Sequence, residues 1–186
     1  MNTAIQLVVE FAKLLPSFED LSQDDQLILI KLGFFEVWLT RISTLSVTNC
    51  IVFEDSVAFS QDQLDIAFDP SFSSAMLSYV DCVNRLQMTD EEMATFTATI
   101  LLCPQRAGLN DPEAVTNMHD SVAAAFHNAV SATNATNVPA RLEAFAAALD
   151  DLRFLSSRYY ELMSWCRKHW HQIDIPALFA EMFDIP

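Results

Sequence analysis

The sequence predicts an all-α protein that contains one short β-hairpin. Only two glycines occur in 186 residues, and 52% of the residues are hydrophobic, which is enough apolar material to bury a large core. Long segments with apolar residues at spacings of three or four alternate with clusters of Pro, Asn and Asp, and this alternation favours helices over a sheet. We expect residues 1–186 to form one domain, because no internal repeat or linker divides the chain.

The first two predicted helices are delimited by a proline and by a capping signal. Residues 3–15 have a helical pattern that ends where Pro16 restricts the residue before it. Ser22, followed three positions later by Asp25, resembles a capping box at the start of a second helix. This second helix, residues 23–45, is apolar almost all round, so it should lie between other layers of the fold.

The middle of the chain carries the one good strand signal. Residues 51–53 and 57–59 are short β-prone runs on either side of Glu54-Asp55-Ser56, a pattern that predicts a hairpin. Asp69-Pro70 then begins a helix that reaches about Leu86, because proline at the first helical position sacrifices no N–H group that the helix needs.

Further capping signals predict two helices in the next segment. Thr89-x-x-Glu92 is a capping box for a helix that Pro104 limits, and Asp111-Pro112 begins another helix that reaches about Ser131. The polar residues 134–138 follow. They include Asn134-Ala135-Thr136, a weak match to a glycosylation acceptor that we interpret as a loop.

The last two predicted helices differ greatly in length. A long helix runs from Pro139 to about Trp170, and its apolar residues recur at spacings of three or four. These residues are Leu142, Phe145, Leu149, Leu152, Leu155, Tyr159 and Leu162. Residues 175–183 form a short terminal helix with one apolar face, beside which Glu181 lies.

The charge pattern excludes two classes of partner. A formal net charge of -15 argues against a nucleic-acid surface, because such surfaces rest on clustered Lys and Arg. The most apolar region is interrupted by Lys31, Glu36 and Arg41, so it falls short of the ~18 uncharged apolar residues of a membrane span. We therefore expect a soluble, intracellular domain that contacts neither nucleic acid nor a membrane.

Catalytic and metal-binding patterns are missing from the sequence. The four cysteines lie far apart without a C-x-x-C pair, and the four histidines form no pair suited to a shared metal. We also find no nucleophile elbow, no phosphate-binding glycine loop and no H-E-x-x-H motif. We expect no catalytic residues, no metal and no cofactor.

Two separated segments resemble a known receptor family. Phe11-Ala12-Lys13, Phe18, Leu21, Asp25-Gln26 and Leu29-Ile30-Lys31 resemble the signature of nuclear receptor ligand-binding domains. The residues 4–13 and the closing Pro176-x-Leu178-Phe179-x-Glu181-Met182-Phe183 are most similar to the retinoid-related orphan receptors and their invertebrate counterparts in the moulting cascade. The resemblance runs from the third helix of that family to its terminal helix, so we expect the family's first helices and its zinc-finger DNA-binding domain to be absent from this chain.

Membership of this family implies a three-layer antiparallel helical sandwich and a role in transcription regulation in the nucleus. By resemblance, Lys13 would bind the C-terminal carbonyls of a leucine-rich coactivator helix, and Glu181 would accept from its N-terminal N–H groups. The groove between these two charges would be lined by Gln26, Leu27, Ile30, Lys31, Leu178 and Met182.

The family also implies a pocket for a sterol or another lipophilic ligand. The candidate lining residues are Ala4, Ile5, Val8, Phe35, Leu39, Arg41, Ile42 and Phe53. The apolar ones among them are equally consistent with ordinary core, and Arg41 with structural pairing. Because Phe34, Phe35 and Trp38 are bulky, we expect a reduced pocket and docking of the terminal helix without ligand.

Several functional alternatives stay open at this point. The domain is either a ligand-controlled receptor module or a ligand-independent scaffold for partner proteins, and the intact terminal segment argues for activation over corepressor binding. In the family, the long helix is the dimer seam, commonly with the retinoid X receptor, although similar receptors also act as monomers. His169 and His171 precede the terminal helix, but Phe179 has no hydroxyl, so we expect no histidine latch of the family type.

Overall fold

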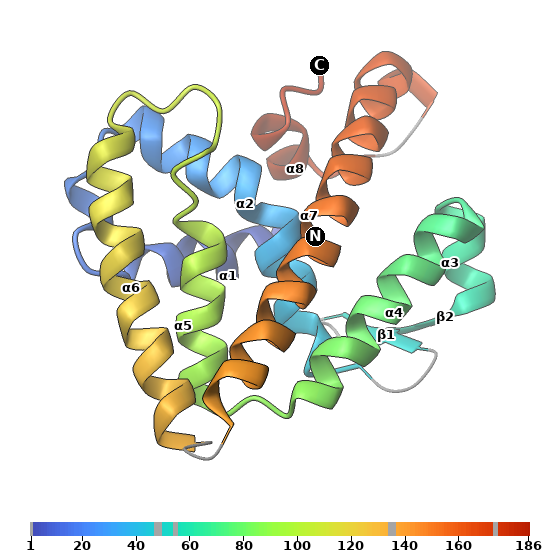
Figure 1. Cartoon of the computed structure of the whole chain (residues 1–186). Coiled ribbons are helices and arrows are strands. Elements are labelled where there is room, and N and C mark those ends of the chain that lie inside the picture. The colour runs from blue at the N-terminus through green and yellow to red at the C-terminus, as the bar shows by residue number, and fades with distance from the viewer. Residues whose placement is uncertain (1, 47–49, 54–55, 134–136, 173–174) are drawn as a thin grey trace.

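The computed structural model describes residues 2–46, 50–53, 56–133, 137–172 and 175–186. Within these residues the chain forms eight α-helices, two strands and two 3₁₀ turns (Figure 1). The helices are α1 (Asn2–Lys13), α2 (Gln23–Ser43), α3 (Gln61–Ala67), α4 (Pro70–Leu86), α5 (Asp90–Leu101), α6 (Pro112–Thr133), α7 (Val138–His169) and α8 (Ala177–Met182). The strands are β1 (Cys50–Val52) and β2 (Ala58–Ser60), and the 3₁₀ turns are η1 (Phe18–Asp20) and η2 (Trp170–Gln172).

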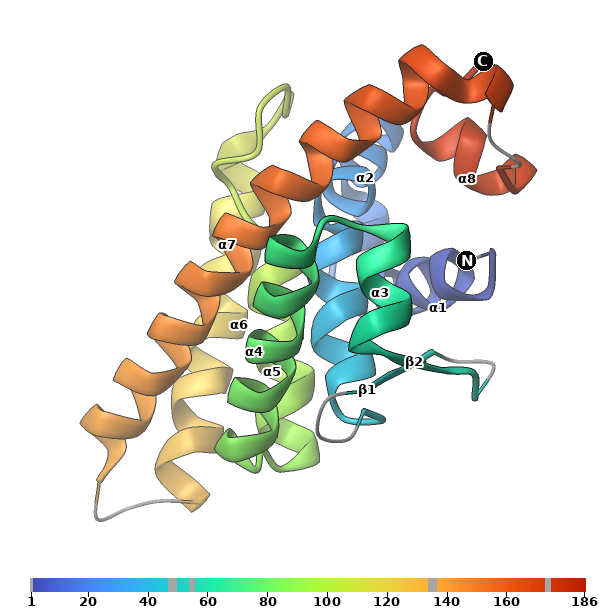
Figure 2. The ribbon, with the colours of Figure 1, turned by 90° about the vertical axis from the view of Figure 1, so that its right-hand side faces the viewer.

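The second helix lies in the middle of the molecule. Helix α2 contacts α1, α4, α5 and α7, and every residue from Gly33 to Thr40 is buried. Figure 2 shows α1 on one side of α2 and the long α7 on the other. The expected all-α helical sandwich with one hairpin is confirmed. Helix α2 can be apolar almost all round because it has neighbours on all sides.

The hairpin forms close to where the sequence predicts it. The two strands pair antiparallel, with Ile51 opposite Phe59, and the N–H of Phe53 donates to the carbonyl of Val57 at 2.9 Å. The predicted Glu54-Asp55 part of the turn and the Asn134-Ala135-Thr136 loop lie outside the described residues.

One helix was missed, and two helices end earlier than expected. The short α3 follows β2 directly, and it begins with a capping box of Ser60 and Gln63. Helix α1 ends at residue 13 instead of 15, and α2 at residue 43 instead of 45. In both cases the next two N–H groups donate to carbonyls three residues back, which tightens the helix end into a 3₁₀-like turn.

Asp25 has a different role from the one its spacing suggests. Ser22 caps α2 by accepting from the N–H of Asp25 at 3.1 Å. The carboxylate of Asp25 instead accepts from the backbone N–H groups of Asn110 at 2.6 Å and Asp111 at 3.2 Å. These bonds, above all the one from Asn110, hold the pKa of Asp25 below its ordinary value. They tie the start of α2 to the connection between α5 and α6.

A second buried carboxylate joins three helices at the opposite end of α5. The side chain of Glu92 is inaccessible to solvent, and Arg141 at the start of α7 binds it through two hydrogen bonds of 2.7 Å. It also accepts from Thr133 Oγ1 at 2.9 Å, at the end of α6, and from the N–H of Thr89 at 2.9 Å. Burial alone would raise the pKa of Glu92, but these hydrogen bonds outweigh it and lower the pKa to about 2.

A third buried carboxylate, that of Glu36, lies in the centre of α2. Arg106, from the α5–α6 connection, and Arg153, from α7, both bind Glu36 Oε2, at 2.7 and 2.5 Å. Gly33 makes room for this arrangement, because a Cβ at that position would lie 3.0 Å from Arg106 Nη2 and 3.0 Å from Leu101 Cδ1. No helix of the described residues is both long enough and apolar enough to cross a membrane.

Replacing Glu92 by glutamine should destabilise the fold in a pH-dependent way. Because the folded pKa of about 2 lies below the ordinary value of 4.5, the charge of Glu92 stabilises the folded state above about pH 4.5, and this stabilisation is lost as the pH falls towards 2. We expect Glu92→Gln to lower the free energy of unfolding by about 3 kcal/mol at neutral pH, since Arg141 loses its buried partner.

Urea denaturation at pH 7 and at about pH 3 measures this effect. The difference between wild type and Glu92→Gln should be smaller at the lower pH. The exposed neighbour Glu91 is the matched control, and Glu91→Gln should change stability little at either pH. An equal deficit for Glu92→Gln at both pH values would contradict the assigned role of the charge.

Candidate functional site

The terminal helix docks on the body of the molecule through aromatic side chains. Phe179 and Phe183 are buried, and their rings meet Phe34 of α2 edge to face at centroid distances of 6.4 and 6.0 Å. Phe183 also meets Tyr159 of α7 at 6.0 Å. Helix α8 contacts α1 as well, so it lies against three helices from different parts of the chain (Figures 1 and 2).

Polar contacts fix the chain where α8 ends. Lys31 of α2 forms an ion pair with Asp184, and this pair lowers the pKa of the Asp184 carboxyl. Nε of Arg167 donates to the carbonyl of Phe183 at 2.6 Å, and the N–H of Ile185 donates to the carbonyl of Ala180 at 2.9 Å. Among the described residues, neither His169 nor His171 takes part in these contacts.

The two residues of the predicted charge pair lie on helices that touch. Lys13 is exposed in the last turn of α1, and Glu181 is exposed on α8. Within the described parts of the chain, neither side chain has a hydrogen-bond or ion-pair partner. The structure thus leaves the cation at the end of α1 and the anion on α8 without a partner among the described residues.

The predicted groove residues fall into two groups. Leu27 is 54% exposed, while Gln26, Ile30 and Leu178 are half-buried, so these four side chains contribute to the surfaces of α2 and α8. Gln26 donates through Nε2 to the carbonyl of Leu21 at 2.9 Å, which orients its side chain. Lys31 and Met182 are less available, because Lys31 pairs with Asp184 and Met182 is buried.

The predicted pocket residues lie in the core. Ala4, Ile5, Val8, Phe35, Leu39 and Ile42 are all buried. The ring of Phe35 stacks on Tyr159 at 4.3 Å, and Trp38 stacks on Phe53 at 5.4 Å. Arg41 donates to the carbonyl of Leu7 at 3.2 Å, which supports structural pairing, although its partner is a backbone carbonyl instead of a carboxylate.

Aromatic rings occupy much of the region where the ligand was expected. None of the eight predicted pocket residues lines any of four well-formed cavities that the described residues enclose. Two polar atoms within this aromatic cluster, Trp38 Nε1 and the Tyr159 hydroxyl, are buried and have no hydrogen-bond partner among the described residues. Burial raises the pKa of Tyr159, so its hydroxyl stays protonated.

Sequence reasoning missed the residues that hold the terminal helix. Asp184 pairs with Lys31, and Arg167 donates to the carbonyl of Phe183. Arg106 and Arg153 hold Glu36. Lys31 and Asp184 lie far apart in the sequence, and so do Glu36 and its two arginines. The one usable signal was Glu36 itself, because a carboxylate within an apolar helix requires a cationic partner.

Comparisons with known proteins agree with this architecture. Residues 1–169 match the family described as the ligand-binding domain of nuclear hormone receptor, a range that ends before α8. The chain is 38% identical over 188 residues to Ecdysone-induced protein 78C of Drosophila melanogaster, a match that covers 100% of this chain and 22% of that protein.

Two further relatives come from a mammal and a crustacean. Nuclear receptor subfamily 1 group D member 2 of Rattus norvegicus is 32% identical over 160 residues, covering 85% of this chain and 28% of that protein. Nuclear hormone receptor E75 of Metapenaeus ensis is 33% identical over 161 residues, a match that covers 85% of this chain and 26% of that protein. The chain thus spans about a quarter of the length of these relatives. The predicted resemblance is confirmed, and this chain belongs to the nuclear hormone receptor ligand-binding domain family, whose members are transcription factors and not enzymes.

Proposed function

We propose that this domain recruits coactivator proteins by binding a leucine-rich helix between Lys13 and Glu181. The docked position of α8 carries this proposal, because it brings an unpaired glutamate close to the helix that ends in an unpaired lysine. The C-terminal carbonyls of a bound helix attract Lys13, and its N-terminal N–H groups attract Glu181. Opposite charges at the two ends therefore select both the register and the direction of the partner helix.

The surface between the two charges suits such a partner. Leu27, Ile30 and Leu178 supply apolar area for leucine side chains. Gln26 adds a polar side chain to this surface. We no longer assign Lys31 and Met182 to direct contact, since both act in holding α8 against the body.

We also propose that α8 reaches its closed position without a lipophilic ligand. The support is the packing of Phe34, Phe179, Phe183 and Tyr159, which links α2, α7 and α8 through the chain's own rings. This is the ligand-independent form of the function. The unpaired Trp38 Nε1 and Tyr159 hydroxyl are the feature that favours the alternative, a ligand with a polar group among these rings.

The remaining partner assignments follow from the family. We place the domain's activity in the nucleus, and we assign no nucleic-acid contact to the domain itself. The exposed Phe154 and Trp165 on α7 support a dimer seam for a second receptor domain, identical or not. The choice between monomer, homodimer and heterodimer stays a prediction.

Removing either end of the charge pair should weaken coactivator binding. We expect Lys13→Ala and Glu181→Ala each to cost about 1 to 3 kcal/mol, because each removes a set of charge-assisted hydrogen bonds. Fluorescence polarisation of a labelled leucine-rich peptide measures this loss as a rise in dissociation constant of about 5- to 150-fold.

Exposed charges elsewhere on the chain serve as matched controls for this titration. Lys168→Ala and Glu143→Ala make the same substitutions on α7 and should leave the peptide affinity unchanged. Wild-type affinity in both Lys13→Ala and Glu181→Ala would contradict the proposed clamp, the pair of charges on Lys13 and Glu181.

The docking of α8 should depend more on ring packing than on its ion pair. The Lys31–Asp184 pair involves an Asp184 side chain that is 71% exposed, so Lys31→Ala should destabilise docking by only about 0 to 1 kcal/mol. Phe183 is fully buried, and Phe183→Ala should cost about 3 to 5 kcal/mol. Hydrogen exchange of residues 177–186 should therefore accelerate far more in Phe183→Ala. The reverse order would show that the ion pair dominates.

The purified protein should carry no stoichiometric lipid. We expect its native mass spectrum to show the mass of the chain alone, and added sterols to leave hydrogen exchange in α8 unchanged, because docking already uses the chain's own side chains. A bound sterol at one equivalent that slows exchange in α8 would instead establish ligand control.

A further inference from the structure

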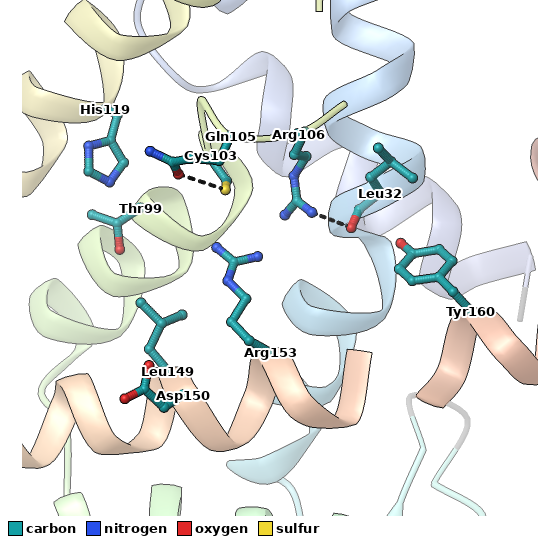
Figure 3. Close-up of a pocket in the computed structure, with 10 residues that line it drawn as sticks. All are labelled: Leu32, Thr99, Cys103, Gln105, Arg106, His119, Leu149, Asp150, Arg153 and Tyr160. Carbon is teal, nitrogen blue, oxygen red and sulfur yellow. Dashed lines mark hydrogen bonds between the residues drawn. The ribbon is translucent and has the colours of Figure 1, made fainter. Parts of the chain in front are cut away.

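A cavity of about 530 Å³ lies apart from both the coactivator groove and the aromatic cluster. It opens between α2, α5, α6, α7 and the connection of α5 to α6, and its lining side chains converge from these elements (Figure 3). Small-molecule sites typically measure ~300–1,000 Å³. The cavity therefore has the size of a ligand site, and the two arginines in its lining distinguish it from a lipid pocket.

Two arginines line the cavity, and both bind one buried carboxylate that is not itself part of the lining. Arg106 and Arg153 both bind the single oxygen Oε2 of Glu36, so two guanidinium groups share one buried anion. Figure 3 shows these two guanidinium groups pointing toward one another across the cavity. Asp150, the one acidic residue of the lining, is exposed to solvent, where its charge is screened.

Both arginines have N–H groups without a hydrogen-bond partner among the described residues. The side chain of Arg106 is 7% exposed, and its Nε is buried without a hydrogen-bond partner among the described residues. The side chain of Arg153 is 32% exposed, and its only hydrogen bond within the described residues is the one from Nη1 to Glu36. A guanidinium group has five N–H donors in a planar fork that matches carboxylate and phosphate oxygens.

The other walls suit the body of a small organic molecule. Leu32 and Leu149 are apolar, and the ring of Tyr160 faces the cavity with its hydroxyl committed to the carbonyl of Lys31 at 2.9 Å. His119 and Gln105 lie on the far side from Tyr160 and offer further polar contacts. Figure 3 shows the two guanidinium groups between Leu149 and Tyr160, so cationic groups lie next to apolar surface in this cavity.

We propose that this cavity binds a small organic anion, with its carboxylate or phosphate group on Arg153 and Arg106 and its apolar body against Leu149. The bound group would accept hydrogen bonds from the guanidinium N–H groups that have no partner. This site is separate from the proposed clamp, so it stands or falls independently of coactivator binding. If the arginines serve only as structural partners of Glu36, the cavity has no preference for anions.

The test uses three aromatic probes that differ in their polar group. Phenyl phosphate and benzoate carry the two candidate anionic groups, and neutral benzamide is the matched control for the ring. Binding is followed by the side-chain Nε–H signals of the arginines in ¹⁵N-labelled full chain. We expect the anions to shift the Arg106 and Arg153 signals saturably, with dissociation constants on the order of 1 mM or below for ligands of this size, and benzamide to leave the signals in place.

Two variants probe the cavity by different means. Arg153→Gln removes the more exposed guanidinium group and should weaken the preferred anion by about tenfold or more. Leu149→Trp narrows the cavity while keeping every charge, and it should weaken binding even if Arg153→Gln folds poorly. Arg85→Gln, at an exposed arginine outside the cavity, should bind like the wild type.

The outcomes separate the proposal from its alternative. A stronger response to phenyl phosphate or to benzoate identifies which oxyanion the site prefers, and either one supports an anion site. Equal binding of benzamide, or unchanged anion binding in Leu149→Trp, overturns the proposal, because the arginines are then structural only.

Discussion

The buried carboxylate of Glu36 is the constraint around which the rest of the structure is arranged. Helix α2 has neighbours on all sides, and an ionised side chain at its centre, 2% exposed, would cost several kcal/mol without partners. Arg106 and Arg153 supply the compensating charges, and Arg106 also donates to the carbonyls of Leu32 and Ile100. One carboxylate thereby connects the central helix to the α5–α6 connection and to α7. Gly33 is required beside it, because any larger residue would meet the guanidinium group of Arg106.

The docking of α8 depends on the geometry that Glu36 imposes. Because α2 and α7 are held together, Phe34 and Tyr159 present a joint aromatic surface to Phe179 and Phe183. Buried aromatic side chains cover about 150–250 Å² each, which at about 25 cal/mol per Å² exceeds the contribution of an exposed ion pair several-fold. Ring packing therefore decides whether α8 docks, and the contact of Lys31 with Asp184 refines where its end lies. Phe34, a bulky residue on α2, thus supports the terminal helix directly.

Local patterns predicted the fold well, whereas contacts between distant residues were not predictable. The Thr89–Glu92 capping box, Pro70 at the first turn of α4 and the apolar α2 all appear as expected, since each rests on neighbours within a few residues. The family signature predicted that Lys13 and Glu181 share one site, which no periodicity could do. The partners of Asp25 lie 85 and 86 residues away and are backbone N–H groups, which carry no sequence signal. The cavity beside Glu36 was missed for the same reason, because its two arginines come from separate elements.

Charge pairing distinguishes the structural residues from those available to a partner. Glu36, Glu92 and Asp25 are buried with their hydrogen bonds made inside the fold, and Lys31 is committed to Asp184. Lys13 and Glu181 differ, because both are exposed and have no partner within the described residues. An exposed charge costs little to leave unpaired in water, so the fold gains nothing from holding these two side chains in place. A bound helix that offers its two ends would give each of them a partner at once, while the net charge of -15 favours the approach of a helix with basic flanks.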